Sequence, residues 1–342
     1  MRSPTIPDIM QTIPLSTVAS FARGIVNAVE TENGLRFERF DAETLAYYEK
    51  IGSARHDRAC CSAGVTLAFR TDSRQLALSL DLTTQVRDYS FADVCVDGAF
   101  IASAGAADAS AFIELQTALP GARGAMRTVS VHLPHCRQAI VRAMALDDGA
   151  RCEADEARPL LLAFGDSITQ GMNAHHPALA YATVMARTLD MSLLNLGVGG
   201  HVFDVEGLCA PPHPAPDLIT VAYGINDWNR SCDIASARPW LGRLREWYPE
   251  APVFVFEPIW AGKEGMDVSP KPNSAGRTLA DARRELGGIV DEFPGIVRVG
   301  SDRLVPAVAA FLSDGIHPND AGHAVYGLNA ANAIREALRR RA

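Results

Sequence analysis

The feature that most constrains this chain is an apolar run that stops abruptly at a glycine. Residues 160–164 are unbroken hydrophobic sequence, typical of a strand buried on both faces of a sheet. Gly165, Asp166 and Ser167 follow, and Gly171 comes four residues after the serine. A parallel strand that ends in such a turn presents its next side chain at the carboxyl edge of the sheet, where open α/β folds bind ligands. Ser167 is therefore a candidate nucleophile. The alternative is that Asp166 or Ser167 only caps the following helix.

From residue 160 onward, strand patterns and helix patterns alternate. Strands are predicted over 192–196, 217–222, 253–259 and 296–299, and helices over 179–189, 239–247, 278–293 and 321–341. Such alternation indicates a parallel, doubly wound sheet with helices on both of its faces.

Before residue 147 the hydrophobic period is mostly two. Residues 65–70 and 76–82 alternate apolar and polar around a turn at 71–73, which predicts an antiparallel hairpin. A second hairpin is predicted around Asp97-Gly98. Short strands with turn signals between them indicate a β-sandwich, of jelly-roll type. Residues 41–51 predict one short helix within this region.

The length of 342 residues favours two domains. The patterns predict an irregular leader over 1–20, a β-sandwich domain over 21–146, an acidic linker over 147–158 and an α/β domain over 159–342. Every candidate catalytic residue follows the linker, so we expect the chemistry to need no residue of the first domain.

The composition excludes several classes of partner. A formal net charge of −8 argues against nucleic acid, and no stretch is long enough to span a membrane. The N-terminal residues lack a continuous apolar segment, which predicts a cytoplasmic protein, with a secreted form as the alternative. No metal or cofactor is expected, because no cysteines have metal-ligand spacing. The seven cysteines are Cys60, Cys61, Cys95, Cys136, Cys152, Cys209 and Cys232.

Further polar residues follow the ends of other predicted strands. Gly200 follows the second strand and Asn226 follows the third, so both are expected on the same edge as Ser167. Asp314 and His317 lie three residues apart just before the last helix. A serine needs a base to take its proton, and a histidine base needs an acid to fix its tautomer. One loop can present both of these groups.

These motifs resemble those of the SGNH hydrolases, the GDSL-type esterases. Four blocks occur in the family's order: Gly165-Asp166-Ser167, residues 195–200 (Asn-Leu-Gly-Val-Gly-Gly), residues 224–227 (Gly-Ile-Asn-Asp) and residues 314–318 (Asp-Gly-Ile-His-Pro). The resemblance implies a flavodoxin-like sheet. It also implies that Ser167 is the nucleophile, His317 the base and Asp314 the acid. The oxyanion hole would comprise the amides of Ser167 and Gly200 and the side chain of Asn226, with Gly199 as an alternative to Gly200.

The β-domain that precedes the motifs is similar in architecture to that of two-domain carbohydrate acetyl esterases. The resemblance implies a serine esterase acting on short O-acyl esters, O-acetylated sugars among them. The alternatives are an acyltransferase or thioesterase with the same triad, and a carbohydrate-binding protein with a vestigial hydrolase domain. Trp228 and Trp260 follow strand ends and are candidates to bind substrate, although ordinary packing explains them equally well. His323 is interpreted as a surface residue. The sequence leaves the oligomeric state open.

Overall fold

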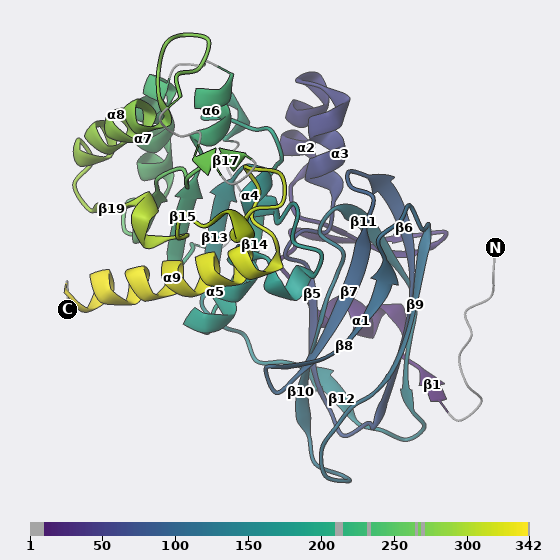
Figure 1. The fold of residues 1–342 in the computed structure, drawn as a ribbon. Coiled ribbons are helices and arrows are strands. Elements are labelled where there is room, and N and C mark those ends of the chain that lie inside the picture. The colour runs from purple at the N-terminus through teal and green to yellow at the C-terminus, as the bar shows by residue number, and fades with distance from the viewer. Residues whose placement is uncertain (1–9, 209–214, 231–233, 264–265, 268–270, 341–342) are drawn as a thin grey trace. The chain divides into compact units, whose positions relative to one another are not determined.

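The chain folds into two compact units, each described here by itself. The computed structural model describes residues 10–208, 215–230, 234–263, 266–267 and 271–340. One unit, the β-unit, contains the described residues up to Phe40, together with Cys60–Ala157 and His175–Ala178. The other, the α/β unit, contains Asp41–Ala59, Arg158–Ala174 and the described residues from Leu179 onward (Figure 1).

The β-unit is a sandwich of two antiparallel sheets. One has the strand order β3-β4-β11-β6-β9 with β1 paired to β11, and the other has the order β12-β5-β10-β7-β8 with β2 paired to β5. Leucine, valine and phenylalanine side chains from both sheets fill a single core between them. The strands are β1 (Met10–Thr12), β2 (Ala22–Arg23), β3 (Asn27–Thr31), β4 (Gly34–Glu38), β5 (Thr66–Thr71), β6 (Gln75–Gln85), β7 (Ser90–Val96), β8 (Ala99–Ala106), β9 (Phe112–Ala118), β10 (Arg127–His132), β11 (Arg137–Asp147) and β12 (Cys152–Ala154).

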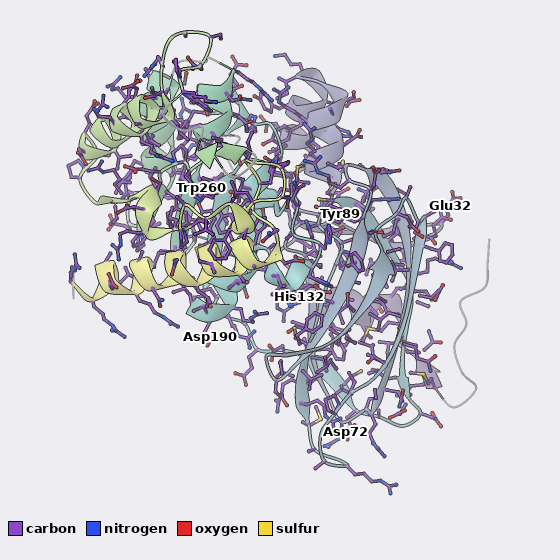
Figure 2. The ribbon with its side chains drawn as sticks, in the orientation of Figure 1. Glu32, Asp72, Tyr89, His132, Asp190 and Trp260 are labelled. Carbon is purple, nitrogen blue, oxygen red and sulfur yellow. The ribbon has the colours of Figure 1, made fainter. Side chains whose placement is uncertain are left out.

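The first predicted hairpin is wrong in its pairing, although both of its strands exist. β5 pairs with β10, whereas β6 pairs with β11 and β9 in the opposite sheet. The chain crosses between the sheets near Asp72, at one end of the sandwich (Figure 2). The apolar faces of the two strands therefore meet across the core, where Leu67 and Leu78 are both fully buried. An alternating pattern shows that one face of a strand is buried. It does not show whether the next strand pairs with it in the same sheet or faces it from the opposite sheet.

The second hairpin is confirmed. β7 and β8 pair antiparallel, and both turn residues, Asp97 and Gly98, have positive φ, as a tight hairpin turn requires.

The expected leader and linker are wrong in part. β1 and all but the last residue of helix α1 (Leu15–Phe21) lie within the span 1–20 expected to be irregular, and Val18 is buried in the core. Residues 1–9 lie outside the described residues. β12 lies within the expected linker and pairs with β5. Both errors concern segments of three to seven residues, too short to show a hydrophobic period.

The α/β unit is built on a sheet that is parallel throughout, with the order β14-β13-β15-β16-β19. Numbered along this unit, the order is 2-1-3-4-5, the flavodoxin-like arrangement. This confirms the predicted fold class. The strands are β13 (Leu160–Gly165), β14 (Ser192–Gly197), β15 (Leu218–Ala222), β16 (Val253–Phe256) and β19 (Ile296–Val299), and β17 (Gly262–Lys263) pairs with β18 (Met266–Asp267) separately.

Helices cover both faces of this sheet. On one face the ring of Phe256 lies 6.1 Å from that of Tyr326 in α9, and on the other the ring of Phe164 lies 5.4 Å from that of Trp240 in α7. No helix in the described parts of the chain is both long and apolar enough to cross a bilayer. The helices are α4 (Ser167–Gln170), α5 (Tyr181–Leu189), α6 (Ile225–Asn229), α7 (Ala237–Trp247), α8 (Leu279–Asp291) and α9 (Asp320–Arg339), with 3-10 turns at Pro177–Leu179, Val205–Gly207, Ile234–Ser236, Ser301–Arg303 and Ala309–Phe311.

Two helices from the N-terminal half of the chain group with the α/β unit. Helix α2 (Ala42–Lys50) confirms the short helix predicted over 41–51, with Asp41 as its cap, and is followed by α3 (Ser53–Cys60). The Tyr47 hydroxyl donates a hydrogen bond to Asp204, and the Tyr48 ring lies 5.2 Å from that of His201. The sequence places this segment in the first domain, whereas its contacts attach it to the loops after β14.

Candidate active site

The turn after β13 places Ser167 at the edge of the sheet. Asp166 caps α4, accepting a hydrogen bond from the Ile168 amide at 2.9 Å, and Gly171 ends the helix with a φ of 101°. A Cβ at Gly165 would lie 1.9 Å from Thr169 Oγ1, so only glycine permits this close return of the helix to the strand. The capping and nucleophile interpretations are therefore compatible, because Asp166 caps and Ser167 begins the helix.

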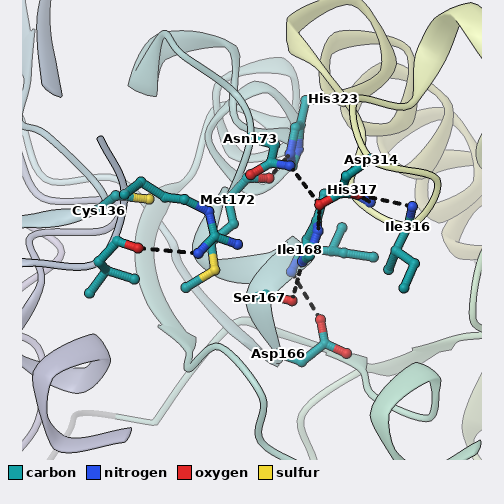
Figure 3. A network of polar contacts seen from close by, with 12 residues as sticks. Cys136, Asp166, Ser167, Ile168, Met172, Asn173, Asp314, Ile316, His317 and His323 are labelled. Carbon is teal, nitrogen blue, oxygen red and sulfur yellow. Dashed lines mark hydrogen bonds and ion pairs between the residues drawn. The ribbon is translucent and has the colours of Figure 1, made fainter. Parts of the chain in front are cut away.

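Ser167, His317 and Asp314 form a continuous hydrogen-bonded row (Figure 3). His317 Nε2 lies 2.8 Å from Ser167 Oγ, and His317 Nδ1 lies 2.8 Å from Asp314 Oδ2. Because the carboxylate can only accept, Nδ1 carries the hydrogen and Nε2 is left to accept from the serine hydroxyl. The three residues come from two segments far apart in the sequence, and they meet in the order that a nucleophile, base and acid require.

Asp314 is held by four hydrogen bonds. Its Oδ1 accepts from the amides of Ile316 and His317 at 3.1 and 2.9 Å. Its Oδ2 accepts from His317 Nδ1 and also from Asn173 Nδ2 at 2.9 Å (Figure 3). Partial burial raises the pKa of Asp314, but the hydrogen bonds from His317 and Ile316 outweigh it and keep the pKa well below its usual range. The carboxylate is therefore ionised wherever His317 acts as a base.

The candidate oxyanion donors lie on loops that begin side by side. Gly165 pairs in register with Gly197 at the end of β14 and with Ala222 at the end of β15. The Gly199 amide already donates to Gln170 Oε1 at 2.9 Å, which favours Gly200 over Gly199 as the donor. Asn226 Nδ2 donates to the carbonyl of His201, the residue after Gly200, at 3.0 Å. A carboxamide nitrogen has two hydrogens, so this bond leaves one for a ligand.

Two buried carboxyl groups lie behind the nucleophile. Burial raises the pKa of Asp166 to about 7 and that of Asp227 to about 6, and the charge of Asp227 adds to the increase at Asp166. Each uses one oxygen for a backbone amide, from Ile168 and Phe203 respectively. These contacts agree with the structural role that capping predicts for Asp166.

The two tryptophans are held by packing contacts. Trp260 is 7% exposed and belongs to the core on the α9 side of the sheet (Figure 2). Trp228 packs against the same core, and its Nε1 donates to the Arg277 carbonyl at 2.8 Å. These contacts support the packing alternative for both tryptophans. The interpretation of His323 as a surface residue is wrong, because the ring is fully buried between the Tyr181 amide and the Met172 carbonyl.

Sequence reasoning missed Asn173, Gln170 and Arg58, which support the site. Asn173 contacts Asp314, Gln170 holds Gly199, and Arg58 Nη1 donates to the Gly199 carbonyl at 3.1 Å. Asn173 and Gln170 come shortly after Ser167 in the sequence, so proximity to the motif was the available signal. For Arg58 no local signal existed. Cys209 and Cys232 lie outside the described residues.

Comparisons with known proteins give a family match and several solved structures with a similar fold. Residues 163–325 match the model of the GDSL-like Lipase/Acylhydrolase family. No curated protein matches the chain. Among solved structures, a salicylyl-acyltransferase from a tetracycline biosynthetic pathway is similar at 19% identity with a TM-score of 0.77, covering 98% of this chain and 96% of that one.

Two further solved structures share the fold. An acetyl xylan esterase from the rumen bacterium Butyrivibrio proteoclasticus is 13% identical with a TM-score of 0.61, covering 97% and 99% of the two chains. A family two carbohydrate esterase from Clostridium thermocellum, in complex with cellohexaose, is 16% identical with a TM-score of 0.60, covering 81% and 94%. At these identities the likeness shows the fold alone. Residues 163–325, which contain Ser167, Asp314 and His317, form a GDSL-like lipase/acylhydrolase domain.

Proposed function

We propose that this protein is a serine esterase that hydrolyses short O-acyl esters, O-acetyl esters of carbohydrates in particular, through Ser167, His317 and Asp314. The observation that carries the proposal is the hydrogen-bonded row from Ser167 Oγ through both ring nitrogens of His317 to Asp314. A histidine with a serine hydroxyl on one nitrogen and a carboxylate on the other is arranged for nucleophilic acyl chemistry.

The row defines each proton transfer. His317 Nε2 takes the proton of Ser167 as Oγ attacks the ester carbonyl carbon, and Asp314 stabilises the imidazolium that forms. Nε2 then gives this proton to the alcohol oxygen as the C–O bond breaks, which leaves an acyl group on Ser167. Water repeats the sequence, with its proton passing through His317 to the serine as the acid is released. The ester is thus split by one water molecule, and the enzyme is returned unchanged.

Three donors are proposed to stabilise the negative oxygen of each tetrahedral intermediate. They are the amide of Ser167 at the start of α4, the amide of Gly200 and the side chain of Asn226. The first amides of a helix have no partner within the helix, which makes the Ser167 amide available to a ligand. Side-chain donors of this kind are typically worth about a hundredfold or more in kcat.

The carbohydrate ester assignment is supported by the family and by the neighbours with the same fold. Residues 163–325 match an acylhydrolase family, and two of the solved structures are described as a carbohydrate esterase and an acetyl xylan esterase. Acyl transfer to another alcohol would use the same acyl-enzyme, with the acceptor alcohol in the place of water.

The decisive experiment compares wild type with Ser167→Ala. Wild type should hydrolyse p-nitrophenyl acetate faster than longer-chain esters, release acetate from an O-acetylated xylo-oligosaccharide, and be labelled covalently by a fluorophosphonate. Ser167→Ala should lose labelling and nearly all activity. Ser192→Ala, at the amino end of the neighbouring strand β14, is the matched control and should retain both. Labelling of Ser167→Ala at the wild-type rate would contradict the proposal, and formation of a new ester with an added alcohol would indicate transfer.

A further inference from the structure

Two guanidinium groups converge on the candidate oxyanion glycine. Arg58 reaches the loop after β14 from α3, and Arg230 reaches it from the residue after α6. A Cβ added to Gly200 would lie 2.8 Å from Arg230 Nη2 and 3.3 Å from Arg58 Nη1. Both cations therefore occupy the space on one side of Gly200, although they come from segments far apart in the sequence.

The position of Arg58 is fixed by the fold. Its Nη1 donates to the Gly199 carbonyl at 3.1 Å, and its Cδ would lie 3.0 Å from a Cβ at Gly199. The side chain thus lies along two successive glycines, and any side chain at either position would displace it. Absence of side chains at 199 and 200 lets a guanidinium approach the backbone that is proposed to bind the reacting oxygen.

A third cation, Arg55, lies near His201, and the His201 ring itself is neutral. Burial lowers the pKa of His201 to about 4, with Asp204 opposing the decrease and Arg55 and Arg230 adding to it. Arg55, on α3, therefore contributes to the positive field around this loop, and His201 does not.

The neighbouring carboxylates already have partners. Asp204 accepts hydrogen bonds from the Tyr47 hydroxyl and from the Glu206 amide. Asp227 is buried and accepts from the Phe203 amide. The guanidinium groups of Arg58 and Arg230 repel each other, and an anion bound between them would be attracted to both. A guanidinium also matches the geometry of carboxylate and phosphate oxygens, with two parallel hydrogen bonds available.

We propose that the ester substrate carries an anionic group, a carboxylate, sulfate or phosphate, which binds between Arg58 and Arg230 beside Gly200. This inference rests on the proposed esterase function and names its substrate class as acidic esters. The acid can belong to the acyl part or to the alcohol part of the ester, because both extend from the carbonyl whose oxygen the Gly200 amide is proposed to bind. The net charge of −8 means that the protein as a whole does not attract anions, so a preference for an anionic substrate would come from this local cationic site.

The test uses two pairs of esters that differ in charge. For the alcohol part, 4-acetoxybenzoate is compared with neutral 4-acetoxybenzamide. For the acyl part, monoethyl succinate is compared with ethyl butyrate. Wild type should favour the charged member of at least one pair, and the pair that shows the preference identifies which part carries the acid. Arg58→Gln and Arg230→Gln should each lower the charged-to-neutral ratio of kcat/KM about tenfold or more, the typical effect of one hydrogen bond to a charged group.

Two controls separate charge recognition from structural damage. Arg243→Gln removes a half-exposed arginine of α7 that pairs with Glu246, and it should leave the ratio unchanged. Arg230→Lys keeps the positive charge, so its charged-to-neutral ratio of kcat/KM should lie between those of Arg230→Gln and wild type. If Arg58→Gln lowers the thermal unfolding midpoint, Arg230 decides the test, because its side chain is exposed and follows the end of α6. Ratios that stay at the wild-type value in both glutamine variants, for both pairs, would overturn the inference.

A binding measurement distinguishes this inference from the proposed function. Calorimetric titration uses the ligands that match the preferred esters: 4-hydroxybenzoate and 4-hydroxybenzamide for the alcohol part, or succinamate and butyramide for the acyl part. The anion should bind more tightly than its neutral counterpart, and this advantage should be lost in Arg230→Gln and weakened by added salt. Equal affinity within the matching pair would overturn the anion site even if the esters are hydrolysed. Hydrolysis of none of the four esters, with no labelling of Ser167, would refute the esterase proposal. Anion binding that requires Arg230 would still support the site in that case.

Discussion

One oxygen of Asp314 serves two partners, and this sharing gives Asn173 a positioning role. Oδ2 accepts from both His317 Nδ1 and Asn173 Nδ2. The amide from Asn173 limits rotation of the carboxylate, so that Oδ2 stays directed at the imidazole. Asn173 has a φ of 71°, a left-handed conformation that asparagine tolerates and glycine adopts freely.

Asn173→Gly should therefore remove the amide without straining the backbone. We expect kcat to fall up to about tenfold with KM nearly unchanged, because one hydrogen bond to a charged group is lost while the substrate contacts remain. The kcat of Asn173→Asp should fall further, because a second carboxylate beside Asp314 competes for the imidazole proton. The unfolding midpoint of each variant is the control. A rise in KM at constant kcat would contradict a role that acts through Asp314.

Asp166 gives a pH-dependent contribution to stability with a defined sign. Carboxyl groups titrate near 4 in unfolded chains, whereas burial raises the pKa of Asp166 to about 7 in the fold. Between these values the folded state holds a proton that the unfolded state releases, so stability is lost as the pH rises.

Asp166→Asn keeps an oxygen to cap α4 but does not titrate. As the pH rises from about 4 to about 7, the free energy of unfolding of Asp166→Asn should increase relative to that of wild type by about 1.4 kcal/mol per pH unit. Above about pH 7 the difference between the two proteins should stay constant. Urea unfolding at pH 5, 6, 7 and 8 measures the difference. A difference between the two proteins that stays constant over this range would mean that Asp166 is not protonated in the fold.

Among the residues of the site, those in short sequence motifs can be predicted, whereas those placed by long-range contacts cannot. Ser167, Asp314 and His317 stand in short motifs with fixed spacing, so each can be named before the structure, and the structure brings all three together. Arg58 lies in a helix of charged residues that is typical of a solvated surface. Its approach to Gly199 is a tertiary contact over 141 positions, which no local pattern reports.

At the level of elements, the return of α4 over the end of β13 depends on Gly165. Its hypothetical Cβ would lie 1.9 Å from Thr169 Oγ1 and 2.9 Å from the Ala222 carbonyl. Thr169 cannot move freely, because it is fully buried and its hydroxyl lies 2.8 Å from that of Tyr181. The strand and helix must therefore separate if residue 165 has a side chain.

Gly165→Ala should lower the free energy of unfolding by about 1–3 kcal/mol or more, and should lower kcat because Ser167 moves with α4. Gly288→Ala is the matched control. Gly288 is exposed in α8, and beyond the local helix backbone no atom lies within 4 Å of the position that a methyl group would take, so alanine should stabilise the helix by up to about 1 kcal/mol. Urea unfolding and ester hydrolysis of both variants provide the comparison. Unchanged stability in Gly165→Ala would contradict the close-packed turn.

The strands are easier to predict from sequence than their pairing. Alternating leucines identify β6 and the apolar run identifies β13, because side-chain period reflects burial directly. The prediction of a parallel sheet is correct because strand–helix alternation leaves few topologies. In the β-unit, by contrast, β5 and β6 are neighbours in sequence but face each other across the core. Turn sequences such as Thr71-Asp72-Ser73 permit a hairpin or a crossing between sheets, and only the whole sandwich decides.

For the whole molecule, the assignment of residues 41–59 changes what a catalytic fragment must contain. The sequence alone predicts that a fragment beginning at the linker keeps its chemistry. The α/β unit includes α2 and α3, however, which contact the loop that contains Gly199 and Gly200. Removing them uncovers the ring of His201, which contacts Tyr47 and Tyr48 on one side and Tyr223 on another, and leaves Asp204 without the Tyr47 hydroxyl.

A fragment of residues 158–342 should therefore fold less stably than the same fragment preceded by residues 41–59 and a flexible Gly/Ser linker. We expect the shorter fragment to lose most hydrolysis of p-nitrophenyl acetate, because Gly199 and Gly200 are no longer held by Arg58. The linked fragment should recover thermal stability and fluorophosphonate labelling of Ser167. Arg58→Gln within the linked fragment tests the specific contact, since it should reduce activity while α2 still covers His201. Full activity in the shorter fragment would show that the loop after β14 holds its conformation without α2 and α3. Inactivity of the linked fragment despite a native unfolding transition would place a further requirement in the β-unit.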